Sequence, residues 1–372
     1  MKRYLACLMI LLSIIPFGAC WDYRGLNEQT IVVGMAVDIR ENGNYHIAFE
    51  VLDLNAFDGG ALTSVLLETE AESLVEAMHA LPVLLHNNVY FGAMDVLILG
   101  IEFVQRHGIE ALVLHLSRDP HMRNSMHVVV SDLEWAADLL RPLEDETWHS
   151  DAILSKTLAE NLSQSERGGQ AGVQAKALFE VFDALQTGGE TFVVPIITAS
   201  EARDIPFARN GLAVFYENEL VGEILEADMP YYLLATSTVR DKVLVLEIEY
   251  ERVAVRVRQS EPSVRARQAE DSLRFYLDLS LQVEILSPPS YGQAAELTRK
   301  IEIALEQELT NFIQKTQETG LDVLGFSTYL RRYHPNIWEQ KAGTWERYFE
   351  SGEVDVRVQA KVQNFGVLRP DF

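Results

Sequence analysis

Few side chains in this sequence have the type and spacing that catalysis or metal binding requires. Three histidines, His115, His121 and His127, are regularly spaced. They fall at a predicted helix end, a proline turn and a predicted strand, so we do not expect them to converge on zinc. The acidic cluster Glu144–Glu146 could bind Ca²⁺ or supply an acid and a base, but no flanking pattern fixes its geometry. Because GxSxG, HExxH, CxxC, Walker and GxGxxG motifs are also absent, we predict a protein that is not an enzyme and has no cofactor and no metal site.

Cys20 is the one residue whose position defines a chemistry. A basic start at residues 1–3 precedes the apolar stretch Tyr4–Ile15 and the small residues Gly18 and Ala19, which is the pattern of a secretory signal. The apolar stretch is shorter than the roughly 20 residues that span a bilayer. Cleavage after Ala19 would leave Cys20 at the new N-terminus, and this arrangement resembles the lipobox of bacterial lipoproteins. We therefore predict a lipoprotein signal peptide at residues 1–19 and lipidation of Cys20.

Two details qualify the prediction for Cys20. Phe17 stands where leucine is usual in a lipobox, and an ordinary secretory cleavage that leaves a free Cys20 thiol is the alternative. The same cleavage removes Cys7, so no internal disulfide is expected. A lipidated Cys20 would hold the chain to a membrane through its acyl chains, since two or more chains give stable attachment.

Composition limits the classes of partner. The 372 residues carry 31 Lys+Arg against 55 Asp+Glu, a net charge of −24, and 48% are hydrophobic. This is a globular composition with room for two or three domains. Nucleic acid binding is not expected, because it depends on clustered Lys and Arg. Adsorption to anionic lipid through a basic patch is excluded for the same reason.

The first half of the chain reads as a mixed sheet with helices packed against it. A hairpin is predicted around Asn42-Gly43, a dipeptide that accepts positive φ at a tight turn. The remaining elements follow from apolar periodicity and turn residues. The predicted strands are Thr30–Ile39, Asn44–Leu54, Asp95–Leu99 and Met126–Val130. The predicted helices are Glu70–Leu81 and Ile101–Leu116, and a third is capped by Ser131 or Asp132 and ends near Arg141. Pro82 ends or kinks the first of these helices.

A helical sub-region is predicted at residues 143–189, with helices at Ala152–Leu162 and Ala175–Leu185. Phe192–Thr198 reads as a strand, and Pro195 within it predicts an edge position because proline donates no ladder hydrogen bond. We place the main domain boundary between residues 205 and 206. The N-terminal α/β domain is then 20–205 and the C-terminal α+β domain 206–372, with a further division near 260–270 left open.

The second half has the clearest periodicity. A hairpin at Leu212–Leu225 turns at Glu217-Asn218, and a short helix begins near Asp228. Three long runs alternate apolar and polar residues and read as single strands, namely Val243–Val257, Leu273–Ile285 and Val354–Val362. Strands that are apolar on one face predict an antiparallel sheet covered by helices on that face only. The fold class is therefore α+β.

The covering helices lie between the second and third of these strands. One carries an apolar stripe that ends before Gly320, and another begins at a capping box formed by Asn336 and Glu339. We interpret the aromatic residues of the second helix as core. The stripe consists of Leu297, Ile301, Leu305, Leu309, Phe312 and Ile313, and the second helix presents Trp338, Ala342, Trp345 and Phe349.

Short motifs in a fixed order along the chain resemble those of one family. After Cys20 come WDYRGLNE at residues 21–28 and IVVGMAVD at 31–38, then GLAVF at 211–215 with ELVG at 219–222, and then DVLGF at 322–326, YHPNIW at 333–338, Trp345 and the strand at 354–362. This ordered set is similar to the Ger(x)C lipoprotein family, the GerAC-like C subunits of bacterial spore germinant receptors. Gly25 departs from the usual first motif.

The resemblance implies a lipid-anchored subunit on the outer face of the inner spore membrane. Its partners would be a membrane-embedded A subunit and a permease-like B subunit, in a complex that senses small nutrients and triggers germination. Cys20 is the residue whose chemistry carries over. The resemblance implies structural roles for Trp21, Asp22, Trp338 and Trp345.

Two other functions stay open at this point. A solute-binding lipoprotein would capture the germinant in a cleft between its two halves. An extracytoplasmic hydrolase would need paired carboxylates, for which Asp145 and Glu146 are the candidates.

Overall fold

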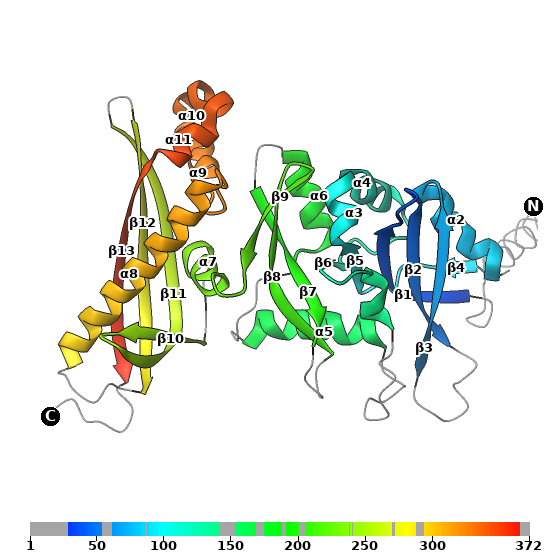
Figure 1. Cartoon of the computed structure of the whole chain (residues 1–372), viewed down its shortest axis with the longest axis horizontal. Helices are drawn as coiled ribbons and strands as arrows, with labels where there is room; N and C mark the ends of the chain where they lie inside the picture. Colours follow the sequence, from blue (N-terminus) through cyan, green and yellow to red (C-terminus); the bar gives the residue numbers. More distant parts are fainter. Residues whose placement is uncertain are drawn as a thin grey trace, which may run out of the picture.

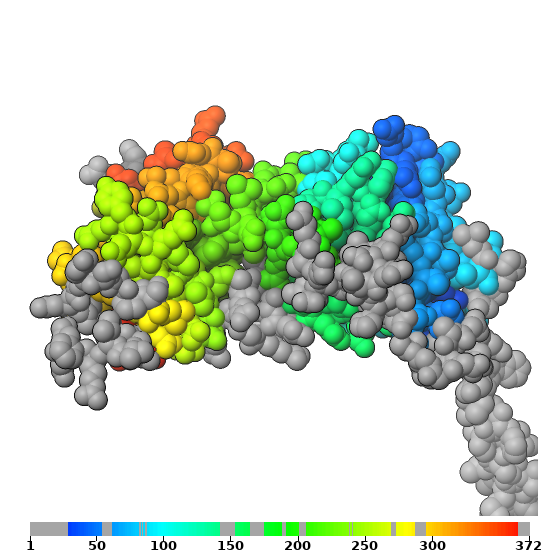
Figure 2. Space-filling view, turned by 60° about the horizontal axis from the view of Figure 1, so that its bottom comes forward, coloured from blue at the N-terminus to red at the C-terminus, as the bar shows by residue number. Residues whose placement is uncertain are grey.

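The structure is a computed structural model that describes residues 29–53, 62–85, 88–141, 153–168, 175–187, 191–200, 206–237, 239, 241–269, 272–287 and 294–364. Cys20 and the cluster Glu144–Glu146 lie outside these ranges. The described elements form two sheets with helices packed against them, at opposite ends of an elongated body (Figures 1 and 2). The α+β class is confirmed.

The larger sheet has the order β3-β2-β1-β5-β6-β7-β8-β9, with the short β4 also paired to β1. Its centre is parallel, because β5 pairs parallel with β1 and β6, and β6 with β7, while the strands on either side of this centre pair antiparallel. The strands are β1 (Gln29–Ile39), β2 (Tyr45–Asp53), β3 (Thr63–Ala71), β4 (Asn88–Tyr90), β5 (Val96–Gly100), β6 (His127–Ser131), β7 (Thr191–Ala199), β8 (Phe207–Tyr216) and β9 (Glu219–Leu225).

Helices cover both faces of this sheet. On one face a core of Met35, Leu97, Val128 and other apolar residues packs against α2 (Leu74–Leu85), α3 (Ile101–His107), α4 (Glu110–Arg118) and α6 (Leu178–Thr187). On the opposite face a smaller core packs against the 3₁₀ helix η4 (Ala136–Leu140) and α5 (Leu154–Gly168). Since both faces are buried, polar side chains of the central strands lie beneath helices and not in solvent.

The second sheet has the order β10-β11-β12-β13 and is covered on one face by the long helix α8 (Figure 1). The predicted stripe of α8 is buried against it. The core continues through α7 to residues of β7, β8 and β9, so the two sheets share apolar contacts. The elements are α7 (Met229–Thr236), β10 (Lys242–Ile248), β11 (Glu251–Ala269), β12 (Ser272–Ser287), α8 (Ala294–Glu318), α9 (Phe326–Tyr333), α10 (Pro335–Lys341), η5 (Ala342–Thr344), α11 (Trp345–Glu350) and β13 (Glu353–Asn364).

The C-terminal sheet departs from the prediction in two ways. The run Val243–Val257 is two strands, because the chain turns at Glu249 and Tyr250, which have φ of 49° and 71°. The last pair, β12 and β13, is parallel, so the prediction of an antiparallel sheet is wrong at this edge. Parallel strands need a long crossover connection, and α8 to α11 provide it.

The N-terminal half also corrects several expectations. Strand β3 is an addition to the predicted elements, and helix α2 begins at Leu74, after that strand, and continues past Pro82 to Leu85. The helix expected after Asp132 is only the short η4. The prediction that β7 is an edge strand is wrong, because β7 lies between β6 and β8. Proline is tolerated in it because β6 pairs only with Ile196 and Ile197, and Pro195 lies beyond the end of that ladder. The predicted capping box is wrong as well, since α10 begins after His334.

The predicted boundary falls between β7 and β8. These two strands pair antiparallel, so both belong to the larger sheet. Residues 260–269, the region of the possible further division, form the second half of β11. The division into domains 20–205 and 206–372 stays a prediction.

Candidate functional site

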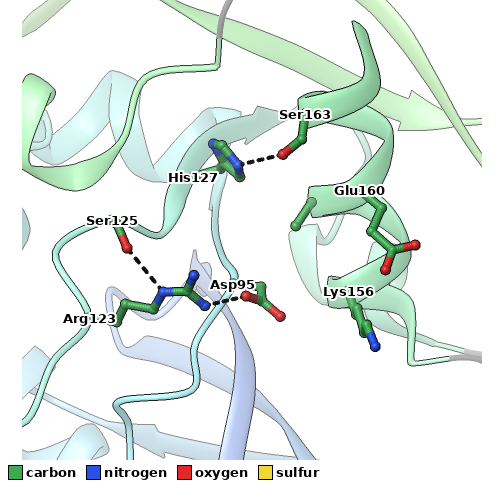
Figure 3. A pocket seen from close by; sticks show the side chains of 8 residues that line it. Asp95, Arg123, Ser125, His127, Lys156, Glu160 and Ser163 are labelled. Carbon is green, nitrogen blue, oxygen red and sulfur yellow. Dashed lines mark hydrogen bonds and ion pairs between the residues drawn. The ribbon is translucent and has the colours of Figure 1, made fainter. Parts of the chain in front are cut away.

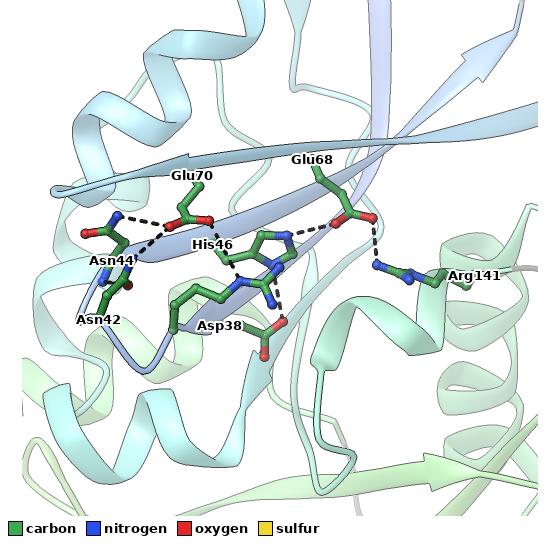
Figure 4. A network of polar contacts seen from close by, with 8 residues as sticks. Asp38, Asn42, Asn44, His46, Glu68, Glu70 and Arg141 are labelled. Carbon is green, nitrogen blue, oxygen red and sulfur yellow. Dashed lines mark hydrogen bonds and ion pairs between the residues drawn. The ribbon is translucent and has the colours of Figure 1, made fainter.

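A network of polar side chains lies where β1 ends and β2 begins (Figure 4). Asp38 and His46 are cross-strand partners and are almost fully buried. The carboxylate of Asp38 accepts hydrogen bonds from the backbone N–H groups of Ala136 (2.9 Å) and Ala137 (3.3 Å). It thereby satisfies donors at the start of η4 that would otherwise be unpaired.

His46 lies beside this carboxylate and is hydrogen-bonded to Glu68. Its Nε2 lies 2.8 Å from Oε2 of Glu68, whose other oxygen accepts a hydrogen bond of 2.7 Å from Arg141. The Nδ1 atom of His46 lies 4.0 Å from Asp38, beyond hydrogen-bond distance. His46 is 3% exposed, and these contacts join β1, β2, β3 and η4.

The exposed end of the network is organised by Glu70. Its carboxylate accepts hydrogen bonds from the side-chain amides of Asn44 (3.0 Å) and Asn42 (3.2 Å). These hydrogen bonds, that of Asn44 first, hold the pKa of Glu70 below its usual value. Arg40 lies between Glu70 and the indole ring of Trp135, with its guanidinium carbon 4.0 Å from the ring centroid.

A charged pocket of about 330 Å³ opens between β6 and α5 (Figure 3). Arg123 is ion-paired with Asp95 and donates a hydrogen bond of 3.0 Å to Ser125. Lys156 and Glu160 line the pocket from α5. The pocket therefore contains charges of both signs, and its arginine is already neutralised by a carboxylate.

His127 and Ser163 form the one histidine–hydroxyl pair of this pocket, with Nε2 and Oγ 3.3 Å apart. A nucleophile activated in this way needs a third group to orient the histidine. The Nδ1 atom of His127 is buried and has no hydrogen-bond partner among the described residues. Among the described residues, none is hydrogen-bonded to this nitrogen as the third member of a triad would be.

A larger pocket, about 560 Å³, lies between the two sheets. The larger sheet contributes Thr191, Tyr216 and Val221, and the C-terminal half contributes residues 319–322, Ser327 and residues 342–347. Beside it the two halves approach closely, because a Cβ atom at Gly222 would lie 2.6 Å from Cδ1 of Leu321. A side chain at position 222 would therefore displace the end of the Leu321 side chain.

Two buried polar groups line this inter-sheet pocket. Trp345 is 9% exposed, and its indole Nε1–H has no hydrogen-bond partner among the described residues. Asp322 accepts hydrogen bonds from the backbone N–H groups of Phe326 (3.0 Å) and Ser327 (2.6 Å) at the start of α9. Burial nevertheless raises the pKa of Asp322. Burial is also the main cause that raises the pKa of Tyr216, and the nearby negative charges of Glu217 and Glu346 raise it further.

The structure separates most residues that the sequence had singled out. His115 lies on α4 and His121 in the following turn, while His127 alone lines the charged pocket. Within the described ranges no three His, Cys, Asp or Glu side chains gather as a metal site would require. Trp338 and Trp345 do meet, edge to face with centroids 5.5 Å apart. Trp345 belongs to the core as predicted, but its place along a pocket was not foreseen.

No described helix is both long and apolar enough to cross a membrane.

Two family models match the chain in succession. Residues 22–199 match the spore germination protein N-terminal domain, and residues 210–366 match the spore germination B3/GerAC-like C-terminal domain. Spore germination protein KC of Bacillus subtilis strain 168 is 20% identical, with 98% of this chain and 97% of that protein covered. Spore germination protein A3 of the same strain is 21% identical, with 98% of each chain covered.

A solved structure has the same fold. The crystal structure of the GerBC protein matches with a TM-score of 0.55 at 14% identity, over 89% of this chain and 97% of that chain. The motif order, the two family models and this shared fold agree. The chain therefore belongs to the Ger(x)C family of GerAC-like spore germination proteins, the C subunits of germinant receptors.

Proposed function

We propose that this chain is a lipid-anchored, non-enzymatic subunit of a nutrient germinant receptor complex that is needed for spore germination. One observation carries the proposal: both halves of the chain match germination family models in order, directly behind a segment at Cys20 that resembles a lipobox. Its partners are the A and B membrane subunits, and its location is the extracytoplasmic face of the inner spore membrane.

The mechanism is tethering. Acyl chains on Cys20 hold the body at the membrane, where a protein anchored next to its partners meets them at a high effective concentration. Weak contacts with the partner subunits then suffice. The net charge of −24 repels anionic headgroups, so the acidic surfaces stay in solvent or face the partners.

The test compares the two cysteines. Cys20→Ala removes the thiol that receives the lipid, and we expect the protein to leave the spore membrane fraction, or to remain uncleaved, with slowed germination and an unchanged circular dichroism spectrum. Cys7→Ala is the matched control, because residue 7 lies in the segment that cleavage removes. A Cys20→Ala protein that is correctly processed and still firmly membrane-bound would contradict the proposal.

Solute capture is a second candidate, favoured by the inter-sheet pocket. A buried Nε1–H without a partner costs free energy unless a ligand or water accepts its hydrogen bond. Trp345 carries such a donor, and the residue lines this pocket together with Thr191, Tyr216 and Thr344. A small polar solute with hydroxyl or carbonyl acceptors would satisfy it.

Calorimetric titration of the purified protein with amino acids, sugars and nucleosides tests this candidate. Saturable binding that Trp345→Phe weakens, since it keeps a ring but removes the donor, supports solute capture. The control is Tyr250→Phe at the exposed β10–β11 turn. Flat titrations with all three classes of solute count against it and leave the tethering function untouched.

A further inference from the structure

The outer side of α2 and the adjoining strand β4 both expose apolar side chains. Val75 is 45% exposed, Val83 is 72% exposed and Tyr90 is 46% exposed. His79 lies between the two valines on the same helical face and is also exposed, whereas Ala77, Met78 and Leu81 point into the core. We call Val75, His79, Val83 and Tyr90 the α2–β4 surface.

Charge sets this surface apart from the rest of the molecule. The sequence from Ala77 to Met94 contains no Asp, Glu, Lys or Arg, although the whole chain has a net charge of −24. Glu76 lies at one margin, in the first turn of α2. The surface can therefore approach a bilayer with little of the electrostatic repulsion that the rest of the body experiences.

Its position relative to the N-terminal segment is equally specific. Strand β4 pairs with the first residues of β1, with Gln29 opposite Asn88 and Ile31 opposite Tyr90. Gln29 follows Cys20 by nine positions, and such a segment spans at most about 30 Å when fully extended. Figure 1 places α2 and β4 at the end of the molecule opposite the four-stranded sheet. A lipid on Cys20 would hold this end, and not the other, within reach of the membrane.

We propose that the α2–β4 surface lies against the lipid bilayer, at the level of the headgroups. The proposal rests on the proposed lipid anchor. The apolar face of an amphipathic helix that lies in the interface reaches the acyl boundary, and tyrosine is enriched at this level because its ring is apolar and its hydroxyl is polar. The contact is weak by itself, but the tether keeps the surface next to the membrane and raises its effective concentration.

Such a contact would orient the receptor subunit. With the α2–β4 end on the bilayer, the four-stranded sheet is the end farthest from the lipid, and the polar face of that sheet is turned toward solvent or a partner. Lipid is the occupant that the short tether and the lack of charge favour. A helix of a membrane subunit is the other candidate for this face, and the experiment distinguishes the two.

The experiment uses the full mature chain, lipidated at Cys20, in vesicles of phosphatidylcholine. Cleavage removes Cys7 and acylation consumes the thiol of Cys20, so an introduced cysteine can be labelled alone. Val83→Cys receives an environment-sensitive fluorophore, and Val75→Cys is a second, independent site. The matched control is Val245→Cys on β10, a valine that is 61% exposed on the other sheet. Circular dichroism checks that each variant folds.

Vesicle flotation reports the anchor, and quenching by nitroxide-labelled phosphatidylcholine reports the contact. We expect all variants to float, with a blue shift and loss of fluorescence at positions 83 and 75 but not at 245. Floating protein that is not quenched at 83 and 75, or is quenched equally at 245, overturns the lipid contact and leaves the anchor intact. Absence of quenching until membrane subunits are added assigns the surface to protein and also overturns it. Protein that does not float overturns the anchor and the contact together.

Discussion

The carboxylate of Glu50, in the middle of β2, accepts a hydrogen bond of 2.8 Å from the backbone N–H of Ser155, the second residue of α5. Its other oxygen accepts from the backbone N–H of Leu154 (2.8 Å) and from the hydroxyl of Ser64 (2.6 Å). Glu50 is 1% exposed. A buried strand carboxylate therefore replaces the usual capping residue of this helix, as Asp38 does for η4.

Removal of this carboxylate should destabilise the larger sheet. Glu50→Ala leaves the N–H groups of Leu154 and Ser155 without partners inside the protein, so we expect a loss of about 2 to 4 kcal/mol in the free energy of unfolding. Glu50→Gln keeps one accepting oxygen and should lose less. Urea unfolding followed by circular dichroism measures both variants, and equal stabilities of Glu50→Ala and wild type would refute the capping role.

The same helix start requires glycine at position 34. A Cβ atom there would lie 2.5 Å from Cβ of Ser155, so Gly34→Ala must displace α5 from β1. We expect about 1 to 3 kcal/mol of destabilisation, the usual cost of overpacking. Gly343→Ala in η5 is the control, because nothing lies within 4 Å of its added Cβ. The prediction is wrong if thermal unfolding shows the same midpoint for both variants.

The buried carboxyl of Asp322 should make the free energy of unfolding depend on pH. Burial raises its pKa in the folded protein above the unfolded value of 3.8, so the native state binds this proton more tightly than the unfolded chain. The contribution to stability is greatest below the unfolded pKa and is lost as the pH rises through the folded pKa. Each tenfold difference in proton affinity between the folded and unfolded states corresponds to about 1.4 kcal/mol.

Asp322→Asn cannot ionise and isolates this effect. Measured from about pH 3 to about pH 7, the stability of the variant relative to wild type should rise with pH. Glu318→Gln, at an exposed position near the end of α8, is the control and should show no such trend. A constant difference between Asp322→Asn and wild type across this range would show that the buried carboxyl does not titrate there.

The free edge of β13 is protected by two carboxylates of α8. Glu306 accepts a hydrogen bond from the N–H of Val358 (2.9 Å), and Glu302 accepts one from the N–H of Ala360 (2.8 Å). Unpaired edge donors invite another strand. We expect the double variant Glu302→Ala, Glu306→Ala to self-associate in size-exclusion chromatography with light scattering. The Gln double variant retains accepting oxygens and should stay as wild type; association of both variants to the same extent would point to charge as the cause.

Periodicity predicted the elements that bury one face. In β12 and α8 the apolar residues recur every second residue and every three to four residues, respectively, and in the structure these residues are buried. The β10–β11 turn was missed for the opposite reason. Glu249 and Tyr250 take positive φ without glycine or asparagine, the residues by which such turns are recognised.

The buried polar groups could not be predicted in the same way. In a sequence, Asp38 and Glu50 look like the polar positions of half-exposed strands, and only the tertiary arrangement places η4 and α5 over them. Trp345 shows the converse. Its position on an aromatic helical face predicts the core, and the structure confirms the core contact with Phe275. That the residue also lines a pocket depends on how the two halves of the chain pack, which no local pattern encodes.

The parallel pairing of β13 with β12 sets an order of events during biosynthesis. The strands of the larger sheet are all present once residue 225 has emerged from the ribosome, whereas the second sheet lacks an edge strand until residues 353–364 have followed. Pairing across so long a separation is slow. The larger sheet can therefore fold before β13 is available to pair beside β12 and α8. Nascent chains stalled before residue 353 should expose the apolar side chains of α8 to chaperones and proteases.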